Sequence, residues 1–558
     1  MFARRSWQIP LLPVGNLTLF MLTGLVIPSA VLSERGLFHP ASVPMFAAPC
    51  GICSNDCMQT AASSRSVIPP LRLLSQSMIC ITVTPTSRTL APADLLNASR
   101  HCDLIELCLD HFINEPNVGE LLRCVDKPIL VSCRSEKAGG KWKGSEEERV
   151  QLLREAIVAG PAYVELDLEI AGGIPRFGKT KRVISWTSLN RPLLKFDEAY
   201  QKCREAKADV VKFTWLTEDL DAAWPLLAAA TQPREVPIVG LGVGRAGLTF
   251  SLLGRKYGSP WIYAALERGM EAFPAQSTVW QLREDYHWND IDTRTRFLGI
   301  IGSGESENIA ARVLNAAFRS MERPILCLPL LPGDLTRFPK MLEKMKINGL
   351  IVDPACNLDL TPLAASSDES ATDSGRLDVL METPQGWRGV CCTFAAIEEA
   401  GRQTLGASDW AERGAVTVLG SSTMARGAAR FFASKGAAVS LAGMSDNAAA
   451  SMARQAGVRH VPWNAVYDLR ADTLVIADYG TPCGLTKGCL NPSIIRERQT
   501  VVDLSVGLRG SDFAVEAAAR GARYIDPVTV FAARLDLQFR QLTGRSLPAD
   551  AFQLGLGG

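Results

Sequence analysis

Apolar and polar positions alternate regularly from Met78 to about residue 290. Short apolar, β-branched runs predict strands, and most are separated by stretches with apolar residues at three- and four-residue spacing, which is typical of amphipathic helices. Eight strands are predicted at Met78–Val83, Leu104–Leu109, Pro128–Cys133, Tyr163–Leu168, Arg182–Trp186, Asp209–Phe213, Pro237–Leu241 and Trp261–Ala264. Helices are predicted at Glu147–Ala159, Phe196–Ala206 and Glu218–Ala230. This alternation predicts a closed parallel (β/α)8 barrel over residues 78–290.

The pattern changes near residue 296. Further strands are predicted at Phe297–Gly302, Pro324–Leu330 and Gly349–Val352, with a helix at Asn308–Arg319 and an exposed loop at Ser366–Ser374. Gly414–Gly420 then runs into a polar turn, a helix and the apolar run Ala437–Leu441. This β-α-β unit, with its turn at a phosphate-binding position, predicts a Rossmann arrangement. We expect an α/β substrate-binding domain at 296–405, completed by a closing helix within 527–548, and a Rossmann domain at 410–526.

Residues 1–77 lack this alternation. Their apolar stretch, Ile9–Leu32, is interrupted by prolines and is marginal for a membrane span. We predict a disordered leader, or a misassigned start with Met78 as the true first residue, and no membrane association. Cys50, Cys53 and Cys57 have metal-like spacing but no evident fourth ligand, so no metal site is predicted.

Composition narrows the class of protein. The 558 residues carry a net charge of +1, which argues against a nucleic-acid partner. Many of the fifteen cysteines, such as Cys80, Cys133 and Cys327, lie in apolar strand-like runs. They are expected to be buried reduced thiols, which favours the cytoplasm.

Several candidate catalytic and substrate-binding residues lie on the predicted barrel. Lys212 is placed at the end of its strand, and the carboxyl ends of barrel strands carry the chemistry in such folds. A partly desolvated lysine can attack a ketone, whereas the alternative is an amine that extends from the strand end into solvent. Glu106, Arg134 and Glu165 are predicted near the ends of strands two to four, and Asp167 shares a strand face with Glu165. Their convergence favours a site for an anionic, hydroxylated substrate.

The motifs in this region resemble type I 3-dehydroquinate dehydratase. They are Ile105–Phe112, Val131–Ser135, Val164–Asp167, Val211–Lys212 and Tyr257–Ser259, in that order. The resemblance implies a (β/α)8 TIM barrel without a cofactor, in which Lys212 forms a Schiff base and Glu106, Arg134, Glu165 and Gln276 contact the substrate. Thr187 replaces the family's proton-shuttling histidine, and Phe250-Ser251 replaces the Ser-Arg pair that supplies a carboxylate-binding arginine.

Residues 296–548 resemble shikimate dehydrogenase, and the tandem order resembles the plant-type bifunctional fusion. The resemblance implies NADP at a turn formed by Gly420, Ser421, Ser422 and Thr423. The family's catalytic lysine is absent because Ile351–Asn357 replaces its Asn-Val-Thr-x-Pro-x-Lys segment, and its aspartate is absent because Cys391–Phe394 replaces its Asn-Thr-Asp-Gly segment. Ala442–Met444 lacks the arginine that binds the NADP 2′-phosphate. NADP binding therefore stays open.

Two hypotheses remain. The first is a fused shikimate-pathway enzyme that serves aromatic amino acid biosynthesis and acts on a small cyclic hydroxy acid through Lys212. The second is a non-catalytic descendant that senses a ligand or scaffolds other enzymes. A homodimer is compatible with either hypothesis.

Overall fold

The computed structural model describes residues 77–190, 195–232, 234–302, 304–353, 356, 358–406, 414–478, 490–504 and 512–556. The chain divides into two units, Met1–Met58 and Gln59–Gly558. The first unit lies outside the described residues. Residues 1–76 of the expected leader, with the Cys50, Cys53 and Cys57 cluster, lie outside them as well.

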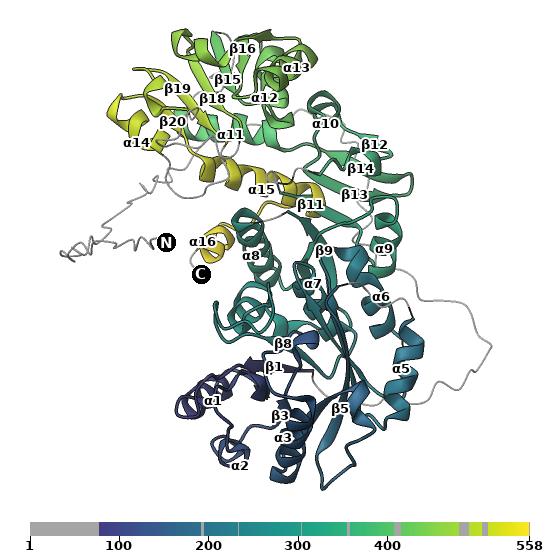
Figure 1. The fold of residues 1–558 in the computed structure, drawn as a ribbon. Helices are drawn as coiled ribbons and strands as arrows, with labels where there is room; N and C mark the ends of the chain where they lie inside the picture. The colour runs from purple at the N-terminus through teal and green to yellow at the C-terminus, as the bar shows by residue number, and fades with distance from the viewer. Residues whose placement is uncertain are drawn as a thin grey trace, which may run out of the picture. The chain divides into compact units, whose positions relative to one another are not determined.

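The first sheet of the second unit contains eight parallel strands (Figure 1). They are β1 (Met78–Val83), β2 (Leu104–Cys108), β3 (Ile129–Ser132), β4 (Tyr163–Asp167), β5 (Lys181–Ser188), β6 (Val210–Leu216), β7 (Ile238–Val243) and β8 (Trp261–Ala264). Their order is β7-β6-β5-β4-β3-β2-β1-β8, so the sheet winds round into a nearly closed barrel. The predicted (β/α)8 fold is confirmed.

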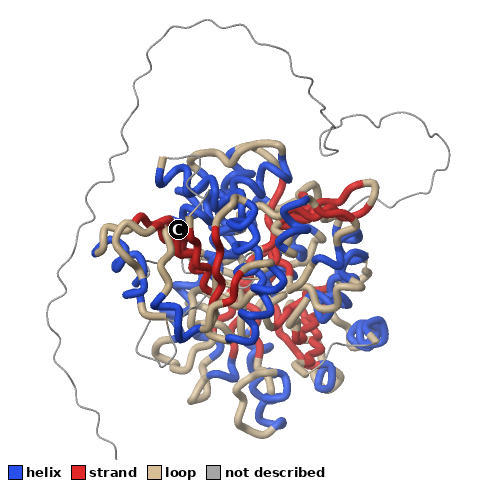
Figure 2. Tube along the Cα trace, turned by 90° about the horizontal axis from the view of Figure 1, so that it is seen from above, coloured by secondary structure: helices blue, strands red, loops and turns tan. Residues whose placement is uncertain are grey.

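Helices connect these strands because parallel neighbours require a crossover. They are α1 (Ala91–Ser99), α2 (Val118–Leu122), α3 (Glu146–Ala159), α4 (Leu168–Ala171), α5 (Phe196–Glu205), α6 (Leu220–Ala230) and α7 (Gly247–Lys256). Successive side chains on a strand point to opposite faces. One set packs under the helices, and the other fills the barrel interior with residues such as Leu104, Leu130 and Val239. In Figure 2, helices in blue flank the strands in red.

The second sheet is mixed, with the order β10-β9-β11-β13-β14-β12. Its strands are β9 (Arg296–Ile301), β10 (Ile325–Leu330), β11 (Gly349–Val352), β12 (Ser366–Ser367), β13 (Val379–Thr383) and β14 (Gly386–Val390). The helices α8 (Glu305–Ser320), α9 (Phe338–Met345) and α11 (Thr393–Leu405) accompany it.

The loop prediction for Ser366–Ser374 is wrong. Ser366 and Ser367 pair with β14, and α10 (Glu369–Ser374) follows them. The side chain of Asp368 accepts a 2.7 Å hydrogen bond from the Ala371 amide and caps this helix. The serine and aspartate composition that suggested a loop is also the composition of helix caps.

The third sheet confirms the Rossmann prediction. Its six parallel strands are β15 (Ala415–Leu419), β16 (Ala438–Ala442), β17 (Arg459–His460), β18 (Thr473–Ile476), β19 (Thr500–Asp503) and β20 (Arg523–Ile525). The order β17-β16-β15-β18-β19-β20 is 3-2-1-4-5-6 when counted along the chain, which is the doubly wound order of dinucleotide-binding folds. Helices α12 (Thr423–Ser434) and α13 (Asp446–Ala456) pack on β16, and α14 (Asp512–Ala519) packs on β20.

The last long helix, α15 (Pro527–Thr543), returns to the second sheet. Gln538 on this helix donates hydrogen bonds to the carbonyls of Val352 and Asp378, at 3.3 and 2.9 Å. The short helix α16 (Ala551–Leu556) packs on α8. Across the described residues, every helix is too short or too polar to cross a bilayer.

Candidate active site

Lys212 lies inside the barrel between two carboxylates. Its Nζ is 2.7 Å from Glu165 Oε2 on β4 and 3.4 Å from Glu106 Oε1 on β2. The ring of Tyr263 on β8 lies below the ammonium, with its centroid 4.5 Å from Nζ. These four residues come from the even-numbered strands, and alternate strands supply the four side chains of one layer inside such barrels. They are here called the polar layer.

The expected position of Lys212 at a strand end is wrong. It is the third residue of β6, which continues through Thr214 and Trp215 to Leu216. The side chain is only 1% exposed, so the ammonium does not reach solvent and the alternative of a solvent-directed amine is excluded. Glu106 and Glu165 likewise lie within their strands and are buried.

Arg134 lies two residues after β3, where it was predicted, and reaches into the polar layer. Its Nη1 is 3.2 Å from Glu106 Oε1, and its Nη2 donates to Cys108 Sγ at 3.1 Å. The ring of Phe273 covers the guanidinium at 5.0 Å. The carboxylate of Asp110 accepts from the amide of Arg134 at 3.1 Å and thereby holds the segment in place.

Gln276 contacts the polar layer through one intermediate. Its Nε2 donates to Thr82 Oγ1 at 3.4 Å, and Thr82 pairs with Glu106 in the β1–β2 register. Its Oε1 accepts from the Ala272 amide at 2.9 Å and closes the turn of residues 272–276. The structure therefore brings Glu106, Arg134 and Glu165 into contact around Lys212, with Gln276 at the margin.

Asp167, which was expected to act beside Glu165, points elsewhere. It forms a 2.7 Å ion pair with Arg149 on α3. This carboxylate therefore fixes a barrel helix to β4.

Burial and charge set the protonation of the polar layer. Burial alone lowers the pKa of Lys212, but the carboxylates of Glu106 and Glu165 outweigh it and the net pKa is raised. Burial opposes ionisation of Glu106, yet Lys212 and Arg134 lower its pKa to about 2. For Glu165, burial outweighs the pull of Lys212 and the net pKa is raised. Lys212 therefore rests as an ammonium, and Glu165 is the nearby carboxylate that most readily takes its proton.

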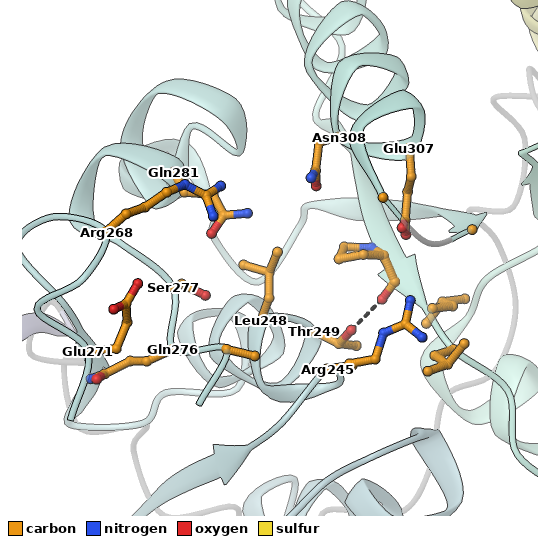
Figure 3. A pocket seen from close by; sticks show the side chains of 16 residues that line it. Arg245, Leu248, Thr249, Arg268, Glu271, Gln276, Ser277, Gln281, Glu307 and Asn308 are labelled. Carbon is orange, nitrogen blue, oxygen red and sulfur yellow. Dashed lines mark hydrogen bonds between the residues drawn. The ribbon is translucent and has the colours of Figure 1, made fainter. Parts of the chain in front are cut away.

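A separate cavity of about 240 Å³ lies beside residues 275–277 (Figure 3). We call it the junction pocket, because its walls come from the barrel and from the second sheet. Its charged and amide side chains are those of Arg245, Arg268, Glu271, Gln276, Gln281, Glu307 and Asn308. Thr249 donates a hydrogen bond to the Pro329 carbonyl at its edge. Gln276 thus lines this pocket while contacting the polar layer through Thr82.

Glu307, on the first turn of α8, has the most perturbed carboxyl of this pocket. Burial and the nearby Asp353 carboxylate raise its pKa to about 7, although Arg245 opposes the shift. The side chains of Arg245 and Glu307 both point into the pocket (Figure 3). Within the described residues, no group of three or more metal-ligating side chains is arranged to hold a metal ion.

The predicted cofactor turn joins β15 to α12. The hydroxyl of Ser422 accepts from the Ala425 amide at 3.3 Å and caps α12, and Thr423 Oγ1 accepts from Arg376 at 2.9 Å. The amides of Ser421 and Ser422 donate to the carboxylate of Asp478. The groups expected to hold NADP are therefore engaged within the chain.

Sequence reasoning missed two residues of these sites, Tyr263 and Asp478. Alternation along Trp261–Ala264 places Tyr263 on the inner face of β8, and that signal could have identified it. Asp478 follows β18, a strand that was not predicted.

The fold and the polar layer define a (β/α)8 protein with a buried, carboxylate-paired lysine on strand six, followed by a mixed sheet and a Rossmann sheet. Residues 79–293 match the family model of type I 3-dehydroquinase. The barrel therefore matches the type I 3-dehydroquinase family, and the predicted resemblance is confirmed.

One relative is the chloroplastic bifunctional 3-dehydroquinate dehydratase/shikimate dehydrogenase of Arabidopsis thaliana. It is 29% identical over 248 residues, which cover 42% of this chain and 41% of that protein. The chain thus matches less than half the length of this relative.

Two solved structures are similar at low identity. The dehydroquinate dehydratase and shikimate dehydrogenase from S. pombe AroM is 16% identical, with a TM-score of 0.39, and covers 86% of this chain and 98% of that chain. The shikimate 5-dehydrogenase from Thermus thermophilus, in complex with NADP(H) and shikimate, is 18% identical with a TM-score of 0.40. It covers 47% of this chain and 99% of that chain.

Proposed function

We propose that the barrel is a lyase of the 3-dehydroquinate dehydratase type, which dehydrates a cyclic hydroxy ketone acid through an imine at Lys212. One observation carries the proposal: a buried ammonium on β6 contacts a carboxylate of raised pKa at 2.7 Å. That pair supplies an amine and an acceptor for its proton within one hydrogen bond. The family match of residues 79–293 supports the substrate class.

The reaction follows from these groups. Glu165 takes a proton from Lys212, and the neutral amine adds to the ketone and releases water to form an imine. The protonated imine withdraws electrons from the adjacent carbon, which then loses a proton. The β-hydroxyl leaves as a second water, and hydrolysis of the imine consumes one water to return the lysine. Glu165 takes the proton-carrying role because Thr187 stands where the family has its histidine.

Glu106 and two residues next to the polar layer, Arg134 and Gln276, serve binding in this proposal. The guanidinium of Arg134 enters from the carboxyl end of β3, where it can meet a carboxylate or hydroxyl of the substrate. Glu106 keeps the cluster neutral and accepts from hydroxyl groups. Gln276 holds the turn of residues 272–276 beside the substrate.

For the whole chain we propose a shikimate-pathway protein with a barrel at 78–290, a substrate-binding domain at 296–405 with 527–548, and a Rossmann domain at 410–526. The described cysteines are all free thiols, and most are buried. This supports a reducing compartment such as the cytoplasm.

Borohydride trapping tests the lyase proposal. The protein is incubated with 3-dehydroquinate, reduced with borohydride and digested. The mass of the peptide that contains Lys212 is then measured by mass spectrometry. We expect a stable adduct on Lys212, together with slow formation of the conjugated enone product in an unreduced sample.

Two variants complete the test. Lys212→Met should give no adduct, whereas Lys179→Met, at an exposed position, should trap like the wild type. An unmodified Lys212 in a protein with a native circular dichroism spectrum would reject the lyase and leave a non-catalytic ligand-binding role.

A further inference from the structure

The Rossmann sheet brings an aspartate to the place where a dinucleotide phosphate would bind. In folds of this order, ligands bind outside the carboxyl ends of the strands where the strand order reverses, between the first and fourth strands. Those strands are β15 and β18, which are neighbours in the sheet. Asp478 lies two residues beyond the end of β18 and therefore enters that crevice.

The carboxylate of Asp478 binds the amides that would hold a phosphate. The Ser421 amide donates to Oδ2 at 2.5 Å, and the Ser422 amide donates to Oδ1 at 3.3 Å. The Ser421 hydroxyl also lies 3.4 Å from Oδ2. Free amides before a helix N-terminus are the usual anion site of this fold, and here a side chain of the same sheet supplies the anion.

Glycine at position 420 fits the same interpretation. A Cβ atom there would lie 2.6 Å from Asp478 Oδ1 and 2.9 Å from the Cβ of Ala425. In a dinucleotide-binding turn, glycine lets the backbone approach the pyrophosphate. In this chain it lets the turn approach the aspartate.

The end of β16 offers no charged side chain that could bind a dinucleotide in place of the amides that Asp478 occupies. Residues 442–444 are Ala, Gly and Met, which carry no charge for a ribose or a 2′-phosphate. A Cβ on Gly443 would lie 2.7 Å from the Gly420 carbonyl oxygen, so this strand end closes directly against the turn. NADP, which the resemblance to shikimate dehydrogenase implies, does not fit these residues.

We infer that Asp478 is a built-in anion that occupies the phosphate cradle of the Rossmann domain and excludes NADP and other dinucleotides from it. A diphosphate would have to displace the carboxylate from both amides, and it would meet a like charge there. The Rossmann domain then acts as a fixed structural element without redox chemistry. This inference is independent of the lyase proposal, which concerns only the barrel.

Binding of NADPH and of inorganic pyrophosphate tests the inference in the full chain. For the wild type we expect no change in NADPH fluorescence and no calorimetric heat with pyrophosphate up to about 1 mM ligand. Asp478→Ser removes the carboxylate and frees both amides, so its affinity for pyrophosphate should rise at least about tenfold. Asp478→Asn keeps the shape of the side chain without its charge and should give a smaller gain in affinity for pyrophosphate.

Asp472→Ser is the matched control. Asp472 lies just before β18, at the opposite end of the strand, and its carboxylate accepts from the Ala415 amide at 2.8 Å. Both serine variants thus lose a carboxylate that binds a backbone amide, but only one loss lies at the cradle. Binding of NADPH by the wild type below 1 mM would overturn the inference. An equal pyrophosphate affinity for the two serine variants, each with a native circular dichroism spectrum, would also overturn it. If Asp478→Ser fails to fold, the wild-type titration and Asp478→Asn still decide.

Discussion

A lysine attacks a ketone only as the neutral amine, so the path of its proton decides whether the barrel reacts. Lys212 faces two carboxylates that differ in character. Glu106 is held ionised by Lys212 and Arg134, whereas burial raises the pKa of Glu165. Of the two carboxylates, Glu165 is therefore the one that more readily takes a proton from the amine.

Replacing Glu165 by glutamine should change two features of imine trapping in opposite directions. The pKa of Lys212 falls because an anion at 2.7 Å is removed, so the trapping rate should reach its plateau at lower pH than in the wild type. The plateau itself should fall by about 10²- to 10⁴-fold because the proton carrier is lost. Borohydride trapping across a pH series measures both features.

Glu169→Gln serves as the control, because this exposed carboxylate lies four residues further along. It should leave both the plateau and its pH unchanged. An unaltered plateau in Glu165→Gln would show that water or another group carries the proton.

The candidate residues were predictable, but their depth was not. The expectation that strands two, four and six bring Glu106, Glu165 and Lys212 together agrees with their contacts in the structure, although they lie within the strands and not at the strand ends. Their burial depends on where β6 ends, and the run Thr214–Leu216 extends the strand beyond the predicted Phe213. That extension is stabilised by pairing with β5 and β7, which the sequence of β6 alone does not reveal.

At the scale of single elements, close packing between β7 and its helices dictates small residues. A Cβ on Gly240 would lie 2.2 Å from Phe250 Cζ on α7 and 2.9 Å from Leu226 Cδ2 on α6. We expect Gly240→Ala to lower the free energy of unfolding by about 1–3 kcal/mol through overpacking. Urea denaturation followed by tryptophan fluorescence measures the change.

Gly172→Ala is the comparison variant, since it introduces the same methyl group. No atom lies within 4 Å of its added Cβ, and the residue has a helical φ of −68°. Its stability should stay level or rise by up to about 1 kcal/mol. Equal losses in the two variants would refute the packing argument.

The bounds of strands and helices were predictable where an apolar run defines the element, and they were not predictable where polar residues begin it. The strands Met78–Val83, Trp261–Ala264 and Gly349–Val352 have the predicted bounds because each is a short run of mostly apolar residues. The helix predicted from Asn308 begins earlier, at Glu305, because polar residues form its first turn. The strand Thr473–Ile476 was missed, and with it the position of Asp478.

At the scale of the whole molecule, buried carboxylates occur in two settings, one compensated by positive charges and one not. In the polar layer, Lys212 and Arg134 compensate Glu106 and Glu165. In the junction pocket, Glu307 lies near a second carboxylate, that of Asp353. Burial and repulsion by Asp353 raise the pKa of Glu307 more than Arg245 lowers it. Ionising Glu307 therefore destabilises the part of the fold where α8 meets the barrel.

Glu307→Gln should remove this penalty. The folded pKa of Glu307 is raised from 4.5 to about 7, so its contribution to stability is complete below pH 4.5 and is lost as the pH rises through 7. The free energy of unfolding of the variant, relative to the wild type, should therefore increase between pH 4.5 and pH 8 by about 1–3 kcal/mol. Other titrating groups are common to both proteins and cancel in this difference. A constant difference across the series would mean that Glu307 ionises without cost in the folded protein.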